Sequence, residues 1–320
     1  MVRKIVSWVL VGLGAFLLVA ALMTHYWAPG MVKKTPESVD TTTYLRGDAS
    51  VIDPEAGEAV PHEVKATSIT ETDTGLSNDD RVVWVSTTCL VIQENDPPDC
   101  VDGDDERLVN ASVEVFASDR ETALAISDPE RLPEEAEPRE GLVNKWPFDS
   151  EKKDYPYWDS MLGEPVTAEY VGTEEYHGVE TYEYRAIVDE TEAEVSEGID
   201  GLYSSEKHIF VEPRTGSIIR QTQEEQRTTE DGDVLLDLDI EFTEEQVEGN
   251  AAEAEENISS LDLVTSTVPI IGYIVGPLLL IVGIALLMLG AAKRGGRRAS
   301  GSDRVDGDGD QTRRQEPVGR

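Results

Sequence analysis

The chain has 320 residues and a formal net charge of −38, with 65 Asp and Glu against 27 Lys and Arg. A chain this acidic repels nucleic acid and anionic head groups at ordinary salt, so both are disfavoured as partners. The sequence carries no recognisable catalytic or zinc-binding pattern and only four scattered histidines. We therefore predict that the protein is not an enzyme and has no metal or cofactor site.

The first element is an apolar run over residues 5–23, in which Ser7 is the only polar side chain. At about 1.5 Å per residue the run can cross a hydrocarbon core, which predicts a transmembrane helix. A cleaved signal peptide is the alternative. The run exceeds a usual signal-peptide core and no small-residue cleavage motif precedes Thr24, so we expect an uncleaved anchor.

Residues 24–267 contain 17 Lys and Arg against 60 Asp and Glu, which gives this region a net charge of −43. The acidic excess is spread evenly, and the chain has 9 Lys against 18 Arg, a composition that resembles proteins of salt-in halophilic archaea. We interpret the charge as a solvated surface. Residues 96–106 offer enough carboxylates for calcium as an alternative, but they lack the spacing of a calcium-binding loop.

Cys89 and Cys100 are the only cysteines, and two prolines lie between them. The loop that they would close is short, so we expect a disulfide in an oxidising compartment. Two N-x-S sequons in the same region, at Asn110 and Asn257, are candidate glycosylation sites.

Alternation of apolar and polar residues predicts half-buried antiparallel strands. It is clearest over residues 111–117, 182–188 and 236–242, and turn signals lie at 119–120, 177–178, 214–216 and 231–232. Residues 127–140, with three prolines among many carboxylates, are predicted to be an exposed loop. The expected fold class is mainly β, with a curved antiparallel sheet that resembles a half-barrel.

Residues 243–263 are rich in Glu and Ala and begin with the capping pattern T-x-x-Q, which predicts a membrane-proximal helix. A second uncharged apolar run at 268–292 predicts a second span. It contains Gly272 and Gly276 at G-x-x-x-G spacing, and Gly12 and Gly14 offer a matching surface on the first run. Close pairing of the two helices and the general abundance of glycine in membrane helices are equal alternatives.

Basic residues flank the two runs toward the chain ends, which places both termini in the cytoplasm. They are Arg3 and Lys4 before the first run, and Lys293, Arg294, Arg297 and Arg298 after the second. Lys33 and Lys34, just beyond the first run, count against this orientation. The predicted topology is a cell-membrane protein with residues 1–4 and a disordered tail at 293–320 inside, and residues 24–267 outside.

Aromatic residues form 6% of the chain, yet five of them fall between residues 146 and 158. The stretch K-W-P-F-D-S-E-K-K-D-Y-P-Y-W-D at 145–159 resembles the W/F-P-F-D-x-E-K-x-x-Y-P-Y-[WF]-D segment of the DUF3068 family, also labelled the PorA family. The likeness continues at G-V-E-T-Y, 178–182, and E-P-R-T-G, 212–216, and takes in both apolar runs. It implies a two-span membrane protein with an outer β-rich domain, mostly without an assigned activity.

The outer region by itself is similar to the half-barrel of LolA- and LppX-type lipoprotein carriers. The similarity rests on a G-x-x-T-Y strand at 178–182 and a later strand, P-x-T-G turn and strand around 213–216. It implies a curved sheet around an apolar cavity for acyl chains, and a role in lipid or lipoprotein handling.

The aromatic segment is the candidate ligand or partner site, through Trp146, Phe148, Lys152, Lys153, Tyr155, Tyr157 and Trp158. One interpretation is a mouth or lid that contacts a lipid or a partner. The other, which we favour, is a crossover whose aromatic rings close the open side of the sheet, since Trp-Pro and Tyr-Pro steps suit an extended segment.

The function expected from the sequence is that of a cell-envelope protein anchored in the lipid bilayer, whose outer β domain binds a lipid, another apolar ligand or an envelope partner. The alternative is a pore-forming subunit. Neither apolar run carries a polar stripe, and two helices alone cannot enclose a wet pore, so such a pore requires an oligomer. The sequence leaves the oligomeric state open.

Overall fold

The computed structural model describes residues 2–53 and 57–298. Most of the tail predicted to be disordered, residues 299–320, lies outside the described residues. The described chain forms two compact units. One is Ala28–Leu263, and the other consists of the two terminal segments, up to Trp27 and from Val264.

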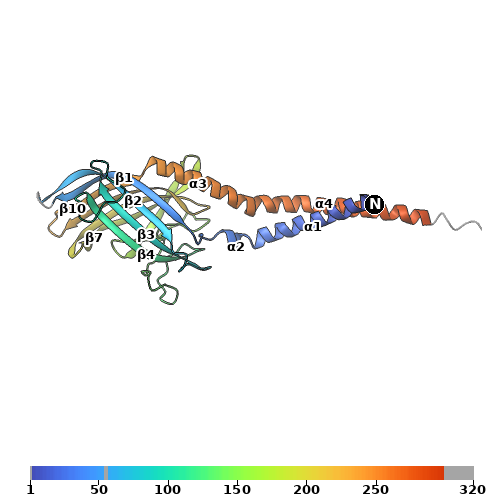
Figure 1. Cartoon of the computed structure of the whole chain (residues 1–320), viewed down its shortest axis with the longest axis horizontal. Coiled ribbons are helices and arrows are strands. Elements are labelled where there is room, and N and C mark those ends of the chain that lie inside the picture. The colour runs from blue at the N-terminus through green and yellow to red at the C-terminus, as the bar shows by residue number, and fades with distance from the viewer. Residues whose placement is uncertain (1, 54–56, 299–320) are drawn as a thin grey trace, which may run out of the picture. The chain divides into compact units, whose positions relative to one another are not determined.

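Ten strands within the described residues of the first unit form one antiparallel sheet in the order β4-β3-β2-β1-β10-β9-β8-β7-β6-β5 (Figure 1). They are β1 Asp40–Asp53, β2 Glu58–Thr72, β3 Arg81–Ile92, β4 Leu108–Asp119, β5 Tyr155–Asp159, β6 Glu164–Tyr176, β7 Val179–Ser196, β8 Ile199–Glu212, β9 Ser217–Thr229 and β10 Val234–Phe242. The mainly β fold class and the half-barrel sheet predicted from the sequence are confirmed.

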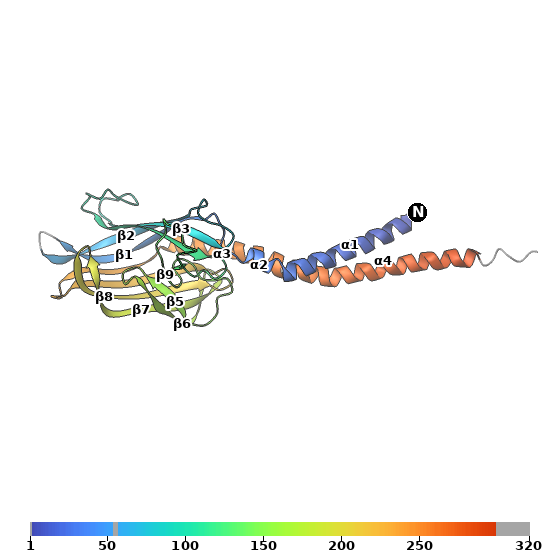
Figure 2. The same cartoon turned by 90° about the horizontal axis from the view of Figure 1, so that it is seen from below.

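The sheet curves so that β1–β3 face β6–β8 (Figure 2). Alternate side chains of each strand point to the concave side, because the side-chain period of a strand is two. One buried cluster on this side contains Tyr184 and Ile209, and the other contains Ala49, Leu90 and Leu238. The strand registers place both clusters on the same face of the sheet. The hydrophobic core of the domain therefore occupies the hollow of the half-barrel.

The crossover between β4 and β5 joins the two edge strands of the sheet. Glu137 pairs with Phe116 of β4, and Leu142 pairs with Tyr157 of β5. The prediction that residues 127–140 form an exposed loop is wrong at the C-terminal end of this range, where Arg139 is buried. Pairing with the strand edge and the ion pair between Arg139 and Glu114, at 3.2 Å, allow this polar segment to leave solvent.

The helix α3, Glu244–Asp262, lies on the convex face of the sheet. Its N-cap is Thr243, whose hydroxyl accepts the N–H of Gln246 at 3.2 Å, as the capping pattern predicts. Val247, Ala251 and Ala254 pack against Ile219 and Val179. A short helix, α2 Pro29–Val32, precedes the sheet.

The second unit is a pair of helices, α1 Val2–Tyr26 and α4 Val268–Arg298, which lie side by side (Figure 1). A π-helical turn, Leu263–Thr267, separates α3 from α4. The described residues contain two helical stretches that are long and apolar enough to cross a membrane: α1, and the stretch Glu244–Leu289, which includes most of α4.

Glycines allow close approach of the two helices. A Cβ atom on Gly14 would lie 2.7 Å from the carbonyl oxygen of Gly276, and one on Gly272 would lie 2.5 Å from the carbonyl oxygen of Leu17. A Cβ atom on Gly12 would meet no atom of α4 within 4 Å, so Gly12 lies off the contact. Gly272, Gly276 and Gly14 therefore form the predicted matching surfaces, whereas Gly12 does not.

Candidate functional site

An open cleft of about 540 Å³ lies in the β domain between α3, the β6–β7 turn, the β8–β9 turn and the beginning of the aromatic segment. We call it the connector cleft. It is lined by Asp149, Ser150, Gly178, Val179, Glu180, Tyr182, Glu212, Pro213, Arg214, Glu255 and Ile258. Four of these eleven residues are acidic and one is basic, so the lining of the cleft carries a net negative charge.

The cleft is the place where three separate sequence blocks meet. Residues 145–159, 178–182 and 212–216 carry the family resemblance, and each block contributes lining residues. The blocks lie in different loops and strands, and antiparallel pairing of β7 with β8 brings two of them together. Parts of the three blocks that make the sequence recognisable therefore meet at one cleft.

The turn between β8 and β9 is held by one buried carboxylate. Glu212 accepts the N–H groups of Arg214 and Thr215, at 2.9 and 2.8 Å, and the hydroxyl of Thr215 at 2.5 Å. Because Glu212 is 3% exposed, these bonds compensate the loss of water around its charge. These three hydrogen bonds fix the conformation of the β8–β9 turn.

Main-chain contacts attach the aromatic segment to this turn. The N–H of Trp146 donates to Gly216 at 3.0 Å, and the N–H of Ser150 donates to Pro213 at 2.7 Å. Gly216 has a φ of 72°, and a Cβ atom there would lie 2.0 Å from the carbonyl oxygen of Trp146. Only glycine fits this position.

Two ion pairs link the cleft to the segments that follow α1 and precede α4 in the chain. Arg214 makes a two-pronged pair with Asp262 near the C-terminal end of α3, at 2.7 and 2.9 Å. Hydrogen bonding to Asp262 raises the pKa of Arg214. Lys33, which follows α2, pairs with Asp149. We call residues 33–37 the N-terminal connector.

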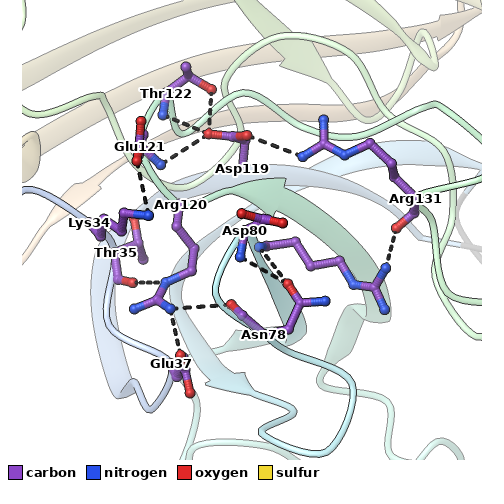
Figure 3. Close-up of polar contacts among 11 residues, drawn as sticks. Lys34, Thr35, Glu37, Asn78, Asp80, Asp119, Arg120, Glu121, Thr122 and Arg131 are labelled. Atoms are coloured by element: carbon purple, nitrogen blue, oxygen red, sulfur yellow. Dashed lines mark hydrogen bonds and ion pairs between the residues drawn. The ribbon is translucent and has the colours of Figure 1, made fainter. Parts of the chain in front are cut away.

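A second group of contacts fixes the N-terminal connector to the end of β4 (Figure 3). The Arg120 side chain donates to the carbonyl oxygen of Thr35 at 2.7 Å and to Glu37 at 2.6 Å. The Thr35 N–H donates to the carbonyl oxygen of Arg120 at 2.8 Å. Lys34 pairs with Glu121 at 3.0 Å. Lys34, Thr35 and Glu37 of the N-terminal connector are therefore all bound to the residues that follow β4.

Lys145 lies against the turn between β8 and β9. Its ammonium group donates to the carbonyl oxygen of Thr215 at 2.5 Å and lies 4.6 Å from the centre of the Phe148 ring. Burial lowers the pKa of Lys145 to about 8, although the negative charges of Glu212 and Glu253 act in the opposite direction.

The aromatic side chains of the candidate segment lie mostly in the core. Trp146 is fully buried and stacks on Tyr157 and Tyr184, at centroid distances of 5.6 and 5.3 Å. Tyr155 is also buried, while Phe148 and Trp158 are half-buried. This placement corresponds to the crossover interpretation for the rings.

The lysines of the same segment lie outside the core. Lys152 is exposed with its ammonium group 4.8 Å from the ring of Tyr182, which lines the cleft. Lys153 pairs with Glu151 and lies 5.3 Å from the Tyr155 ring. The segment is therefore divided, with rings packed inward and charges at the surface.

The remaining predicted residues lie away from the cleft or on its helix. Cys89 and Cys100 form a disulfide beside β4. Asn110 on β4 and Asn257 on α3 are both exposed. The described part of the chain holds no group of three or more His, Cys, Asp or Glu side chains arranged to bind a metal ion.

Sequence reasoning missed the ion-paired residues of the cleft. Arg214 lies inside a recognised block, but its partner Asp262 is 48 positions away, and Lys33 is 116 positions from Asp149. In a region this acidic, every basic residue has many candidate partners. Nothing in the local sequence singles out the right one.

The concave face also carries a charged group that the carrier resemblance does not predict. Asp159 accepts the hydroxyl of Tyr203 at 3.0 Å and lies 3.7 Å from the ammonium group of Lys207. Asp159 and Tyr203 are both buried. An acyl chain in this part of the hollow would have to lie against an ion pair.

Comparison with known protein families gives a match over most of the chain. The family model described as Porin PorA matches residues 6–285. A relative, the Porin PorA of Corynebacterium amycolatum, is 30% identical over 95 residues, which cover 26% of this chain and 25% of the relative. The match to that relative therefore spans about a quarter of its length. Because the family model takes in most of α1, the complete sheet and most of α4, the chain belongs to the Porin PorA family and is a membrane-associated protein.

Proposed function

We propose that the protein is a non-enzymatic, membrane-anchored component of the cell envelope whose β domain binds another envelope protein at the connector cleft. The observation that carries this proposal is the convergence of the three recognised sequence blocks and of both ion pairs, Arg214–Asp262 and Lys33–Asp149, on that cleft. A partner that contacts Arg214 or Asp149 would compete with these pairs. Binding would thus alter the segments that lead to the two anchors.

The topology belongs to the same proposal. α1 and α4 span the membrane with both termini in the cytoplasm, and the β domain is extracellular. Basic residues at the two chain ends support this orientation, and the disulfide between Cys89 and Cys100 suits an oxidising compartment.

A protein partner suits the domain better than an acyl chain does. The apolar side chains of the concave face are already packed, with Leu238 at 7%, Ile209 at 0% and Trp146 at 0% exposure. Interiors packed in this way leave little space for a guest. A lipid ligand would have to displace the crossover, and it would then meet the pair formed by Lys207 and Asp159.

A photoreactive amino acid in the cleft tests the proposal in native membranes. We expect the probe at Ile258 to cross-link one dominant envelope protein that mass spectrometry identifies. The probe at Glu192, exposed on β7 and absent from the cleft lining, serves as the matched control. The same broad set of adducts from both positions would contradict partner binding at the cleft. Stoichiometric lipid that co-purifies with the protein would favour a lipid ligand instead.

A pore-forming subunit is the second candidate, and the description of the family favours it. The outward faces of both helices are apolar, including Phe16 at 66% and Ile281 at 64% exposure. A wet pore lined only by these faces would be unfavourable, so conductance requires an oligomer with another lining. Purified protein that forms stable oligomers and conducts in planar bilayers would support this candidate; a silent monomer would remove it.

A further inference from the structure

The free edge of β4 is an unpaired stretch of backbone in the β domain. β4 is the first strand in the sheet order, so only β3 pairs with it along its whole length. The crossover covers its C-terminal part, through bridges at Phe116 and Ser118. A bulge opposite Leu90 and Val91 interrupts its N-terminal part. Between them lie residues 110–114, which we call the edge window.

The hydrogen-bond pattern shows which groups of the window are open. The carbonyl oxygens of Val115 and Ala117 accept bonds from the crossover, at 2.7 and 2.8 Å, so odd-numbered residues of β4 direct their backbone groups away from β3. Ala111 and Val113 have the same orientation, by the alternation of an antiparallel ladder. Among the described residues, nothing pairs with their outward N–H and C=O groups.

The window is also unusual in its charge. It reads N-A-S-V-E within a region of net charge −43. Its only charge, Glu114, is already paired with Arg139. Val113 is 69% exposed. Exposed edges are usually protected by lysine, proline or an inward charge, and the window lacks these at its centre.

We propose that the edge window pairs with the same window of a second copy of this chain. An antiparallel pair with its two-fold axis at Ser112 sets Ala111 of one copy opposite Val113 of the other, twice. Each of these pairs exchanges two backbone hydrogen bonds, and Val113 gains a cross-strand neighbour. A two-fold contact is self-complementary, so one open strand suffices for both copies.

The surrounding charge determines when this contact forms. Two regions of net charge −43 repel each other, and the range of that repulsion shortens from about 10 Å at 0.1 M salt to about 3 Å at 1 M. Within the window Glu114 is the only charged side chain, and its charge is balanced by Arg139. Self-association therefore strengthens as salt is added, unlike an association through ion pairs. Confinement to one membrane raises the effective concentration of copies.

Single cysteines test the register. Ser112→Cys sets two thiols opposite each other on the two-fold axis, whereas Asn110→Cys lies opposite Glu114 and has no thiol within reach. We expect full-length Ser112→Cys protein in membranes at high salt to form a disulfide-linked dimer, and Asn110→Cys protein to remain largely monomeric. Equal linkage of both variants, or none at Ser112→Cys, would overturn the proposal. If Ser112→Cys instead forms a disulfide with a different protein, that protein and not a second copy of this chain pairs with the edge window, and the proposal is overturned.

Two substitutions at one position test the hydrogen bonds. Val113→Pro removes the outward N–H without removing a bond to β3, and Val113→Thr removes the same side chain while keeping that N–H. We expect Val113→Pro to weaken self-association in detergent by at least about tenfold relative to Val113→Thr, measured by analytical ultracentrifugation. Both variants must keep the Cys89–Cys100 disulfide and the wild-type circular dichroism. Equal association by the two would rule out pairing through this edge; should Val113→Pro misfold, the cysteine pair decides alone.

Discussion

Arg120 shows how a single side chain fixes a connector. It is 12% exposed and donates to Thr35, Glu37 and the carbonyl oxygen of Asn78. We expect Arg120→Ala to lower the unfolding free energy of the β domain by about 2 kcal/mol, because the buried carbonyl oxygen of Thr35 loses a charged donor. Arg131→Ala is the control: its side chain is 47% exposed and its pair with Asp119 should contribute at most about 1 kcal/mol. Denaturant unfolding of the full chain measures both, and equal losses would contradict the role given to Arg120.

Lys145 should make stability depend on pH. Its folded-state pKa, about 8, lies below the ordinary 10.5, so the unfolded chain binds more protons between these values. The unfolding free energy of the wild-type protein should therefore rise, relative to that of Lys145→Met, as pH increases from about 8 toward 10.5. Taking the difference between the two proteins removes the titration of the tyrosines. A difference that stays flat or falls over this range would show that burial does not destabilise the charge.

At the scale of residues, sequence patterns predict short-range features better than they predict contacts between residues far apart in the chain. The Thr243 cap and the turn around Gly216 follow from motifs of a few residues. The contact of Arg120 with Thr35 spans 85 positions, and no periodicity encodes it. The burial of Arg139 is also not predictable from local sequence. Its guanidinium group is buried because it pairs with Glu114 and lies over the Phe116 ring, and both residues are more than 20 positions away.

The helix pair is the element whose geometry depends most on glycine. Gly14→Leu places a side chain where a Cβ atom alone would meet Gly276 at 2.7 Å, while Gly12→Leu enters open space. We expect Gly14→Leu to separate α1 and α4 by on the order of 1–2 Å and to broaden their distance distribution. Spin labels at the exposed positions Val9 and Ile281 can measure this by double electron–electron resonance. Gly12→Leu should leave the distribution unchanged, and an equal shift in both variants would argue against close packing through Gly14.

Among the elements, local period and capping signals locate the helices and most of the strands, but they do not give the order of strands. β1 pairs with β10, nearly two hundred positions later, and this pairing joins the two halves of the sheet. The crossover misled prediction because prolines and carboxylates usually indicate solvent. Here the sheet edges provide hydrogen-bond partners for its backbone, through Glu137 and Leu142. Sheet edges are created only by the complete fold.

Charge governs the molecule as a whole. Folding brings the net charge of −43 carried by residues 24–267 into one compact domain, so repulsion between like charges is stronger in the folded state than in the unfolded chain. Added salt screens this repulsion and therefore stabilises the folded state more than the unfolded chain. We expect the unfolding free energy to rise steeply as NaCl increases from 0.1 to about 1 M, where the screening length falls to about 3 Å. Preferential exclusion of salt would also stabilise the protein, and a charge variant separates the two effects.

Glu190, Glu192 and Glu197 provide that variant, because all three are exposed on or beside β7. Replacing each with Gln removes three negative charges with little change in shape. The triple variant should be more stable than the wild type at low salt and equal to it above about 1 M, because screening removes the repulsion that the substitutions relieve. Denaturant unfolding across the salt series would give two curves that converge. Parallel curves would assign the salt effect to solvent exclusion and would leave the acidic surface without a role in salt-dependent stability.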